Sequence, residues 1–269
     1  MASHHVDRRG SSPPPAGRAG CPLTPAGGVP ADSGGRARPS VGPLFAQVGA
    51  EPNGLGRYRS RVRSYAAVVL AGGAARRMDG VDKPARPVGG CPMRDRVLAA
   101  VADAAPRILV GPPAGAPAGV LITRESPPGG GPVAAAAAGL ARLPAGVDLL
   151  ALLAADLPLL TRDAVRELLG HLDGERGGDQ LAPGPGAIDG VCFVDDAGRR
   201  QPLCGVWRVA PLRAAFTRLA SQRPLAGASL RALLHGLAVH EVPWRGDGPP
   251  PWFDCDTDED LRQAEEWVR

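Results

Sequence analysis

The chain has 269 residues, of which 44% are hydrophobic and 22% charged, enough for one substantial α/β domain or two small ones. No run of about 18 uncharged apolar residues occurs, and the amino terminus lacks the apolar stretch of a secretory signal. We therefore expect neither a membrane span nor a membrane partner. The five cysteines form no CxxC pair, which excludes a typical zinc site and makes a reducing cytoplasm the expected location.

The net charge of +4 is unevenly distributed along the chain. Residues 1–63 hold nine arginines against three acidic residues, whereas the remainder holds 22 basic against 24 acidic residues. No basic stripe interleaved with aromatic residues occurs in that remainder, so a nucleic-acid partner is not expected.

Residues 1–63 differ in composition from everything that follows. They are rich in Pro, Gly, Ser and Arg, without any period, which is typical of a disordered extension. Such an extension is either dispensable or an arginine-rich tail for anionic partners, and its sparse charge blocks favour the first interpretation. Residues 64–269 are predicted to form the folded domain.

The first half of that domain is predicted to alternate strands and helices. Strands are expected in YAAVVL (65–70), RILVG (107–111), GVLIT (119–123) and DLLALLAAD (148–156), and helices in 95–104, 131–143 and after Thr161. The run from Asp148 to Asp156 has no polar alternation, as expected for a strand covered on both faces. This alternation predicts a three-layer α/β/α, Rossmann-like domain with a mostly parallel sheet.

The second half of the domain is less regular, but strands and helices are predicted there too. Two strands are expected to flank a turn at Asp195–Gly198, followed by helices near 211–219 and 229–234, a strand at 238–242 and a terminal helix. Thr257 and Asp260 have the spacing of a capping box for that last helix.

Open α/β sheets bind ligands beyond the carboxyl ends of their strands. Ala71, Gly72 and Gly73 directly follow the first predicted strand, and glycines there allow the backbone to approach a ligand closely. The stretch fits neither GxGxxG nor GxxxxGK[ST]. By itself, therefore, it indicates no more than a turn.

Lys83 is the only lysine of the chain, since the remaining 30 of its 31 basic residues are arginines. It lies in one loop with Arg76 and Arg77, and such a cluster alone is more often a solvated loop. A lysine ammonium is a compact point charge that sits between phosphate oxygens, whereas arginine is a planar fork. A lone lysine in a glycine-rich loop therefore favours a triphosphate ligand.

Two acidic residues follow other predicted strands. Asp156 either holds Mg²⁺ together with substrate phosphates or only shapes the turn into the next helix. Glu125 precedes PPGGGP (127–132), which leads into a helix amino terminus whose N–H groups and dipole can face a ligand.

Together these stretches resemble one known family. LAGGAARRMDGVDKP (70–84) resembles the signature loop of the molybdenum cofactor guanylyltransferases and related nucleotidyltransferases. The resemblance continues through RESPPGGGPVAAAAAGL, LLAADLPLLT, QPLCGVWR and FDCDTDEDL in the family's order and spacing. It covers residues 65–269 and implies the nucleotidyltransferase fold.

The resemblance also implies roles for particular residues. Asp156 would hold Mg²⁺, and Glu125 stands where the family usually has an aspartate that contacts the nucleotide. The implied nucleotide-binding residues are Leu70, Ala71, Gly72, Gly73, Lys83, Glu125 and Asp156, and the implied catalytic residues are Lys83, Arg77 and Asp156. Asp254 and Asp256 either approach the second substrate or metal, or cap the last helix, and we favour capping.

The implied reaction is transfer of GMP from GTP to the phosphate of molybdenum-molybdopterin, with release of pyrophosphate and without a covalent enzyme intermediate. GTP and a molybdopterin-type acceptor are the implied substrates, and molybdoenzymes or other cofactor-synthesis proteins the candidate partners. A sister enzyme that uses CTP or another phosphorylated acceptor stays open, as does a non-catalytic nucleotide-binding protein. Cys204 is expected to be a small buried hydrophobic residue rather than a nucleophile.

Overall fold

The computed structural model describes residues 64–72, 83–112, 116–173 and 188–269. The predictions for residues 1–63, Gly73, Arg76 and Arg77 fall outside these ranges. Everything below concerns the described part of the chain.

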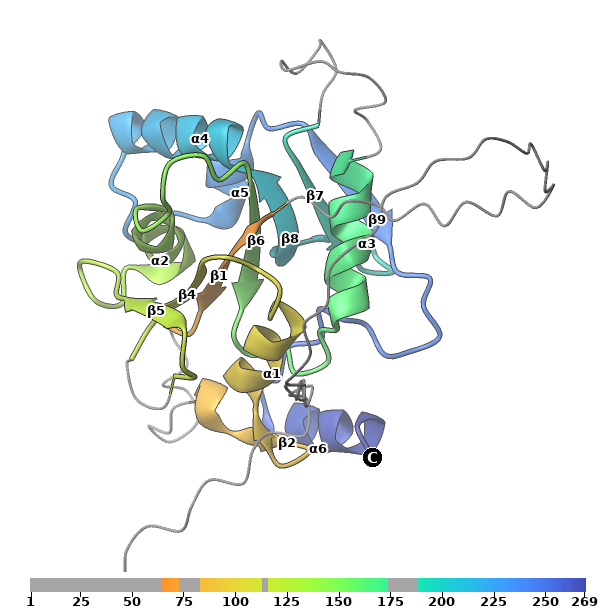
Figure 1. The fold of residues 1–269 in the computed structure, drawn as a ribbon. Helices are drawn as coiled ribbons and strands as arrows, with labels where there is room; N and C mark the ends of the chain where they lie inside the picture. Colours follow the sequence, from red (N-terminus) through yellow and green to blue (C-terminus); the bar gives the residue numbers. More distant parts are fainter. Residues whose placement is uncertain (1–63, 73–82, 113–115, 174–187) are drawn as a thin grey trace, which may run out of the picture.

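A seven-stranded sheet forms the centre of the molecule, in the order β5-β4-β1-β6-β8-β7-β9 (Figure 1). Its strands are β1 (Ala66–Leu70), β4 (Arg107–Val110), β5 (Val120–Thr123), β6 (Leu149–Ala154), β7 (Gly190–Val194), β8 (Arg200–Arg208) and β9 (Val239–Pro243). Strand β8 pairs antiparallel with both of its neighbours, and the other pairs in this sheet are parallel. The prediction of a mostly parallel sheet is confirmed.

The direction of β8 follows from the predicted turn before it. The N–H of Gly198 donates to the carbonyl of Asp195 at 2.8 Å, and Gly198 has φ of 71°, a conformation that glycine adopts without strain. A turn this short can join only antiparallel strands, because a parallel connection needs a long crossover.

Helices cover both faces of the sheet (Figure 1). On one face lie α2 (Gly131–Leu140), α4 (Val209–Gln222) and α5 (Leu230–Leu234), and on the other α1 (Met93–Ala100) and α3 (Arg162–Asp173). The predicted three-layer α/β/α architecture is therefore confirmed. Predicted and observed bounds differ by a few residues, most of all for α1, which begins and ends before the predicted 95–104, and for α4, which extends beyond the predicted 211–219 at both ends.

The residues of β1 divide between the two halves of the core. Ala66, Val68 and Leu70 belong to the cluster under α2, α4 and α5, and Ala67 and Val69 to the cluster under α1 and α3. Successive strand residues point to opposite faces, so a strand covered on both sides has no polar position. This explains the uninterrupted apolar sequence of β1 and of β6.

A third, smaller cluster lies at one end of the domain. Its members come from segments far apart in the sequence: Val88, Met93, Leu159, Cys255, Leu261 and Ala264. It packs α6 (Asp258–Trp267) against the hairpin of β2 (Pro87–Val88) and β3 (Cys91–Pro92), beside the short 3-10 helix η2 (Lys83–Ala85). These elements of two or three residues carry no periodicity, which is why they were not predicted.

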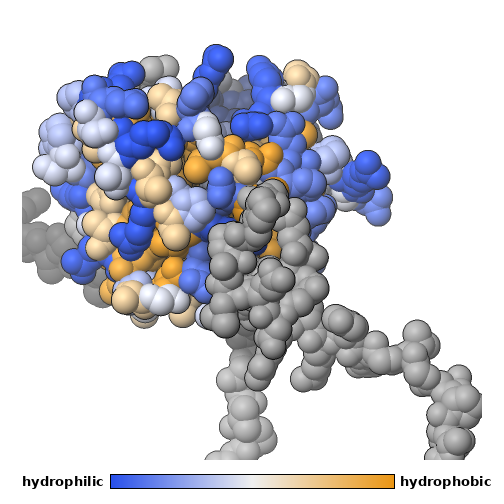
Figure 2. All heavy atoms as spheres, turned by 90° about the horizontal axis from the view of Figure 1, so that it is seen from above, coloured by the Kyte–Doolittle hydropathy of each residue, from blue (hydrophilic) through white to orange (hydrophobic). Residues whose placement is uncertain are grey.

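No helix in the described ranges is long and apolar enough to cross a membrane. Figure 2 shows one face on which hydrophilic residues alternate with smaller groups of hydrophobic ones. The side chains visible on that face do not form one continuous apolar surface.

Two helical glycines test the packing of α2 on the sheet. A Cβ on Gly139 would lie 2.5 Å from Cγ1 of Val68, which is fully buried, whereas a Cβ on Gly170 in α3 would meet nothing within 4 Å. Overpacking costs about 1–3 kcal/mol, and glycine-to-alanine replacement in a helix gains up to about 1 kcal/mol. We expect Gly139→Ala to lower the free energy of unfolding measured in urea and the control Gly170→Ala to raise it. Equal effects of the two changes would contradict the described packing.

Candidate active site

The carboxyl ends of the parallel strands meet at one edge of the sheet. There the N–H of Ala71 donates to the carbonyl of Val110 on β4 at 2.8 Å, and the N–H of Ala155 donates to the carbonyl of Leu70 at 3.0 Å. The side chains of Leu70 and Ala71 are buried. These two residues can therefore offer a ligand only their backbone, and Gly72 is the first that leaves the sheet.

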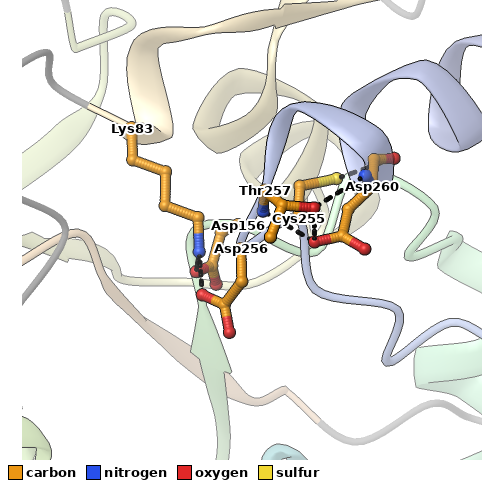
Figure 3. Close-up of polar contacts among 6 residues, drawn as sticks. All are labelled: Lys83, Asp156, Cys255, Asp256, Thr257 and Asp260. Carbon is orange, nitrogen blue, oxygen red and sulfur yellow. Dashed lines mark hydrogen bonds and ion pairs between the residues drawn. The ribbon is translucent and has the colours of Figure 1, made fainter. Parts of the chain in front are cut away.

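Lys83 begins η2 and is almost completely buried, with 4% of its surface exposed. Its Nζ donates to Oδ2 of Asp156 and to Oδ1 of Asp256, each at 2.6 Å (Figure 3). The structure thus brings together Lys83 and Asp156, which the sequence analysis assigned to one site although they are 73 positions apart.

Asp256 is the member of this cluster that sequence reasoning did not assign to the site. The acidic pattern FDCDTDEDL was the available signal, but we favoured helix capping for Asp254 and Asp256. That interpretation was wrong, because Thr257 is the N-cap of α6. Thr257 and Asp260 form the reciprocal capping box, as their spacing predicted, which leaves Asp256 outside the helix and directed at Lys83.

The electrostatics of the cluster are dominated by carboxylates. Burial lowers the pKa of Lys83, but the charges and hydrogen bonds of Asp156 and Asp256 outweigh it, so the pKa of Lys83 is raised. Desolvation and the charges of Asp256 and Asp156 also raise the pKa of Asp254. Two carboxylates therefore contact one ammonium, and this surplus of negative charge suits a further cation.

The carboxylates at this edge fit a magnesium ion that shares its coordination with substrate phosphates and water. Among the described residues, no group of three or more His, Cys, Asp or Glu side chains is arranged to hold a metal alone. Mg²⁺ does not require one, because it is usually bound by one or two carboxylates with waters and substrate phosphates as its other ligands. Asp156, directly after β6 and partly exposed, can supply such a carboxylate.

The Glu125 carboxylate lies beside Gly72, the second residue after β1. Its Oε1 accepts the N–H of Gly129 at 3.1 Å, and a Cβ on Gly72 would stand 3.2 Å from each carboxylate oxygen. Glycine at position 72 therefore leaves room for the Glu125 carboxylate beside the loop. Gly129 precedes α2, whose N-cap is Gly130 and which has no side-chain cap.

The surroundings of Cys204, His171 and His240 differ from those of the ion-pair cluster. Cys204 is buried, and burial raises the pKa of its thiol, which confirms the prediction that it is a small hydrophobic residue. The rings of His171 and His240 contact each other, with centroids 4.9 Å apart. The charged groups that the structure brings together at the carboxyl edge of the sheet are Lys83, Asp156 and Asp256.

An open, mostly parallel sheet with a glycine after β1, a buried lysine and an aspartate at one edge is the arrangement expected of a nucleotide-dependent α/β transferase. The chain belongs to the MobA-like NTP transferase family, whose model matches residues 67–240. It is 32% identical over 206 residues to the molybdenum cofactor guanylyltransferase of Nitrobacter hamburgensis, a match that covers 74% of this chain and 91% of that protein. The family predicted from the motifs is confirmed.

Two solved structures show the same fold. The molybdopterin-guanine dinucleotide biosynthesis protein A of Archaeoglobus fulgidus matches with a TM-score of 0.52 at 19% identity, covering 74% of this chain and 96% of that one. The 4-diphosphocytidyl-2C-methyl-D-erythritol synthase of Anaerococcus prevotii matches with a TM-score of 0.55 at 12% identity, covering 77% and 99%. At these identities the likeness concerns the fold alone.

The buried thiols provide a test of the described packing. Burial raises the pKa of Cys192 to about 11 and that of Cys255 to about 12, so at pH 8 roughly one thiol in a thousand or fewer is the reactive thiolate. We expect Cys192, Cys204 and Cys255 to resist alkylation at pH 8 in the native protein and to react fully in denaturant, as mapped by mass spectrometry. Rapid native labelling of any of the three would contradict this description.

Proposed function

We propose that this chain is a molybdenum cofactor guanylyltransferase, which transfers GMP from GTP to the phosphate of molybdenum-molybdopterin and releases pyrophosphate. The observation that carries the proposal is the contact between Lys83 Nζ and Asp156 at 2.6 Å, at the edge where the LAGG loop leaves β1. Family membership and the relatives named guanylyltransferase support the reaction.

The proposed nucleotide site is built from backbone and two charged side chains. Leu70, Ala71, Gly72 and Gly73 would follow the nucleotide with their backbone, and Lys83 would bind its phosphates. Glu125 would face the nucleoside across Gly72, since its carboxylate already lies against that residue. Gly73 lies outside the described residues, and its role rests on the family resemblance.

In the proposed reaction an oxygen of the acceptor's terminal phosphate attacks the α-phosphorus of GTP. The new P–O bond joins acceptor and GMP, and the bond to the β-phosphate breaks, so that pyrophosphate leaves with the electron pair. Lys83 would neutralise negative charge that shifts toward the leaving phosphates. Arg77, outside the described residues, is proposed to assist by the same charge effect.

Mg²⁺ is part of the proposal as the cofactor. Asp156 would hold it, and the ion would neutralise the triphosphate and orient its oxygens when bound. The side chains of this chain then have two tasks, which are to align the phosphates and to keep the attacking and leaving oxygens in line. The proposal also includes a cytoplasmic location, with molybdoenzymes or other cofactor-synthesis proteins as partners.

The two central residues can be tested directly. We expect Lys83→Ala and Asp156→Ala each to reduce GMP transfer at least about 100-fold, because the first removes the cation that would neutralise the phosphates and the second removes the carboxylate that would hold Mg²⁺. Pyrophosphate release with saturating GTP, Mg²⁺ and molybdenum-molybdopterin is the measurement. Asp258→Ala is the matched control, since Asp258 is exposed and pairs with Arg86 rather than Lys83. Normal turnover in either site variant would contradict the assignment of that residue to the active site.

Base and metal preference can be tested by thermal unfolding with GTP, CTP, ATP and UTP, each with and without Mg²⁺. We expect Mg²⁺-dependent stabilisation by GTP only, which at a ligand concentration of 100 times Kd amounts to about 2.7 kcal/mol. A preference for CTP would indicate a cytidylyltransferase instead. An absent or metal-independent response would indicate a non-catalytic member of the family.

A further inference from the structure

Lys83 is held from two sides by segments that are remote in sequence. Asp156 follows β6, and Asp256 precedes α6, 173 positions after Lys83. The three side chains differ in exposure, at 5% for Lys83, 24% for Asp156 and 75% for Asp256. The backbone around Asp256 contributes to holding this exposed carboxylate at the buried ammonium.

Three contacts fix the backbone on either side of Asp256. The N–H of Cys255 donates to the carbonyl of Asp156 at 3.2 Å, and the Cys255 side chain is buried in the cluster beneath α6. On the other side, the N–H of Thr257 donates to Oδ2 of Asp260 at 2.6 Å as part of the capping box. Asp256 therefore lies between two anchored neighbours, at a fixed distance from the end of β6.

We propose that Asp256 is a positioning residue, which together with Asp156 aims the ammonium of Lys83 at the phosphates of the nucleotide. This inference rests on the proposed function, in which Lys83 binds those phosphates. An ammonium has three N–H donors, and in the described part of the chain the two aspartates take two of them. The third donor remains for a phosphate oxygen, in a direction fixed by the other two bonds.

The geometry also suits lysine at this position. An ammonium is a compact point charge that can contact two carboxylates on different sides and still donate once more, whereas a guanidinium is a larger planar fork whose donors have fixed directions. Without Asp256, the flexible four-carbon side chain would be held by Asp156 alone. Phosphate binding would then have to order the ammonium, which raises the concentration of nucleotide needed.

The test uses the fact that Lys83 is the only lysine in the chain. Lysine labelled with ¹³C and ¹⁵N gives one side-chain spin system in NMR, which reports on this ammonium without nucleotide or turnover. We expect Asp256→Ala to shift and broaden the Lys83 signal and to raise KM for GTP roughly tenfold, the scale of one lost hydrogen bond to a charged group, with a smaller change in kcat. Asp256→Asn keeps an oxygen acceptor, so we expect it to restore most of the signal and of the KM.

Asp258→Ala is the matched control, because it also removes one carboxylate from the same segment, exposed to 73%, without contact to Lys83. We expect it to leave the Lys83 signal unchanged. The inference is overturned if Asp256→Ala leaves the signal and KM as in the parent protein, or if Asp258→Ala shifts the signal equally. If the signal responds as expected but the parent protein transfers no GMP, the proposed function fails and the positioning of Lys83 stands.

Discussion

The ion pairs of the buried Lys83 ammonium connect the elements that meet at the carboxyl edge of the sheet. Lys83 connects the end of the central strand β6, through Asp156, with the segment before α6, through Asp256. A buried ammonium without hydrogen-bonding partners would be deprotonated or would move toward solvent. The two carboxylates keep it charged, so the elements that carry them have to meet at this point, and the small cluster beneath α6 is the packing that brings them there.

This dependence gives the last part of the chain a role in the site. α6 lies apart from the two main helix layers and packs on the hairpin of β2 and β3 (Figure 1). Its face includes Leu261 and Ala264, and its exposed side pairs Asp258 with Arg86, close to Lys83 in sequence. The segments on either side of the ammonium are thus joined twice, by apolar contacts beneath and by an ion pair at the surface.

The sequence allowed the main sheet and its helices to be predicted, because strands buried on both faces lose their polar alternation and helices such as α3 begin at a capping residue. It also allowed Lys83, Asp156, Gly72 and Glu125 to be assigned to one edge, since each follows a strand or its loop. The partnership of Asp256 with Lys83 was not predictable in this way. It depends on a hydrophobic cluster whose members come from residues 88 to 264. The local periodicity of a sequence does not indicate contacts between such distant segments.

The composition of the chain then acquires a structural explanation. The other 30 residues among Lys and Arg are arginines. Of these, Arg86 pairs with Asp258 at the surface, and Arg208 donates to the carbonyls of Ile188 and Leu172 in the interior. A planar fork satisfies such partners well. Lys83 Nζ contacts two carboxylates from different segments, at 2.6 Å each. The compact ammonium suits this contact, so a pressure toward arginine elsewhere is compatible with lysine at this one place.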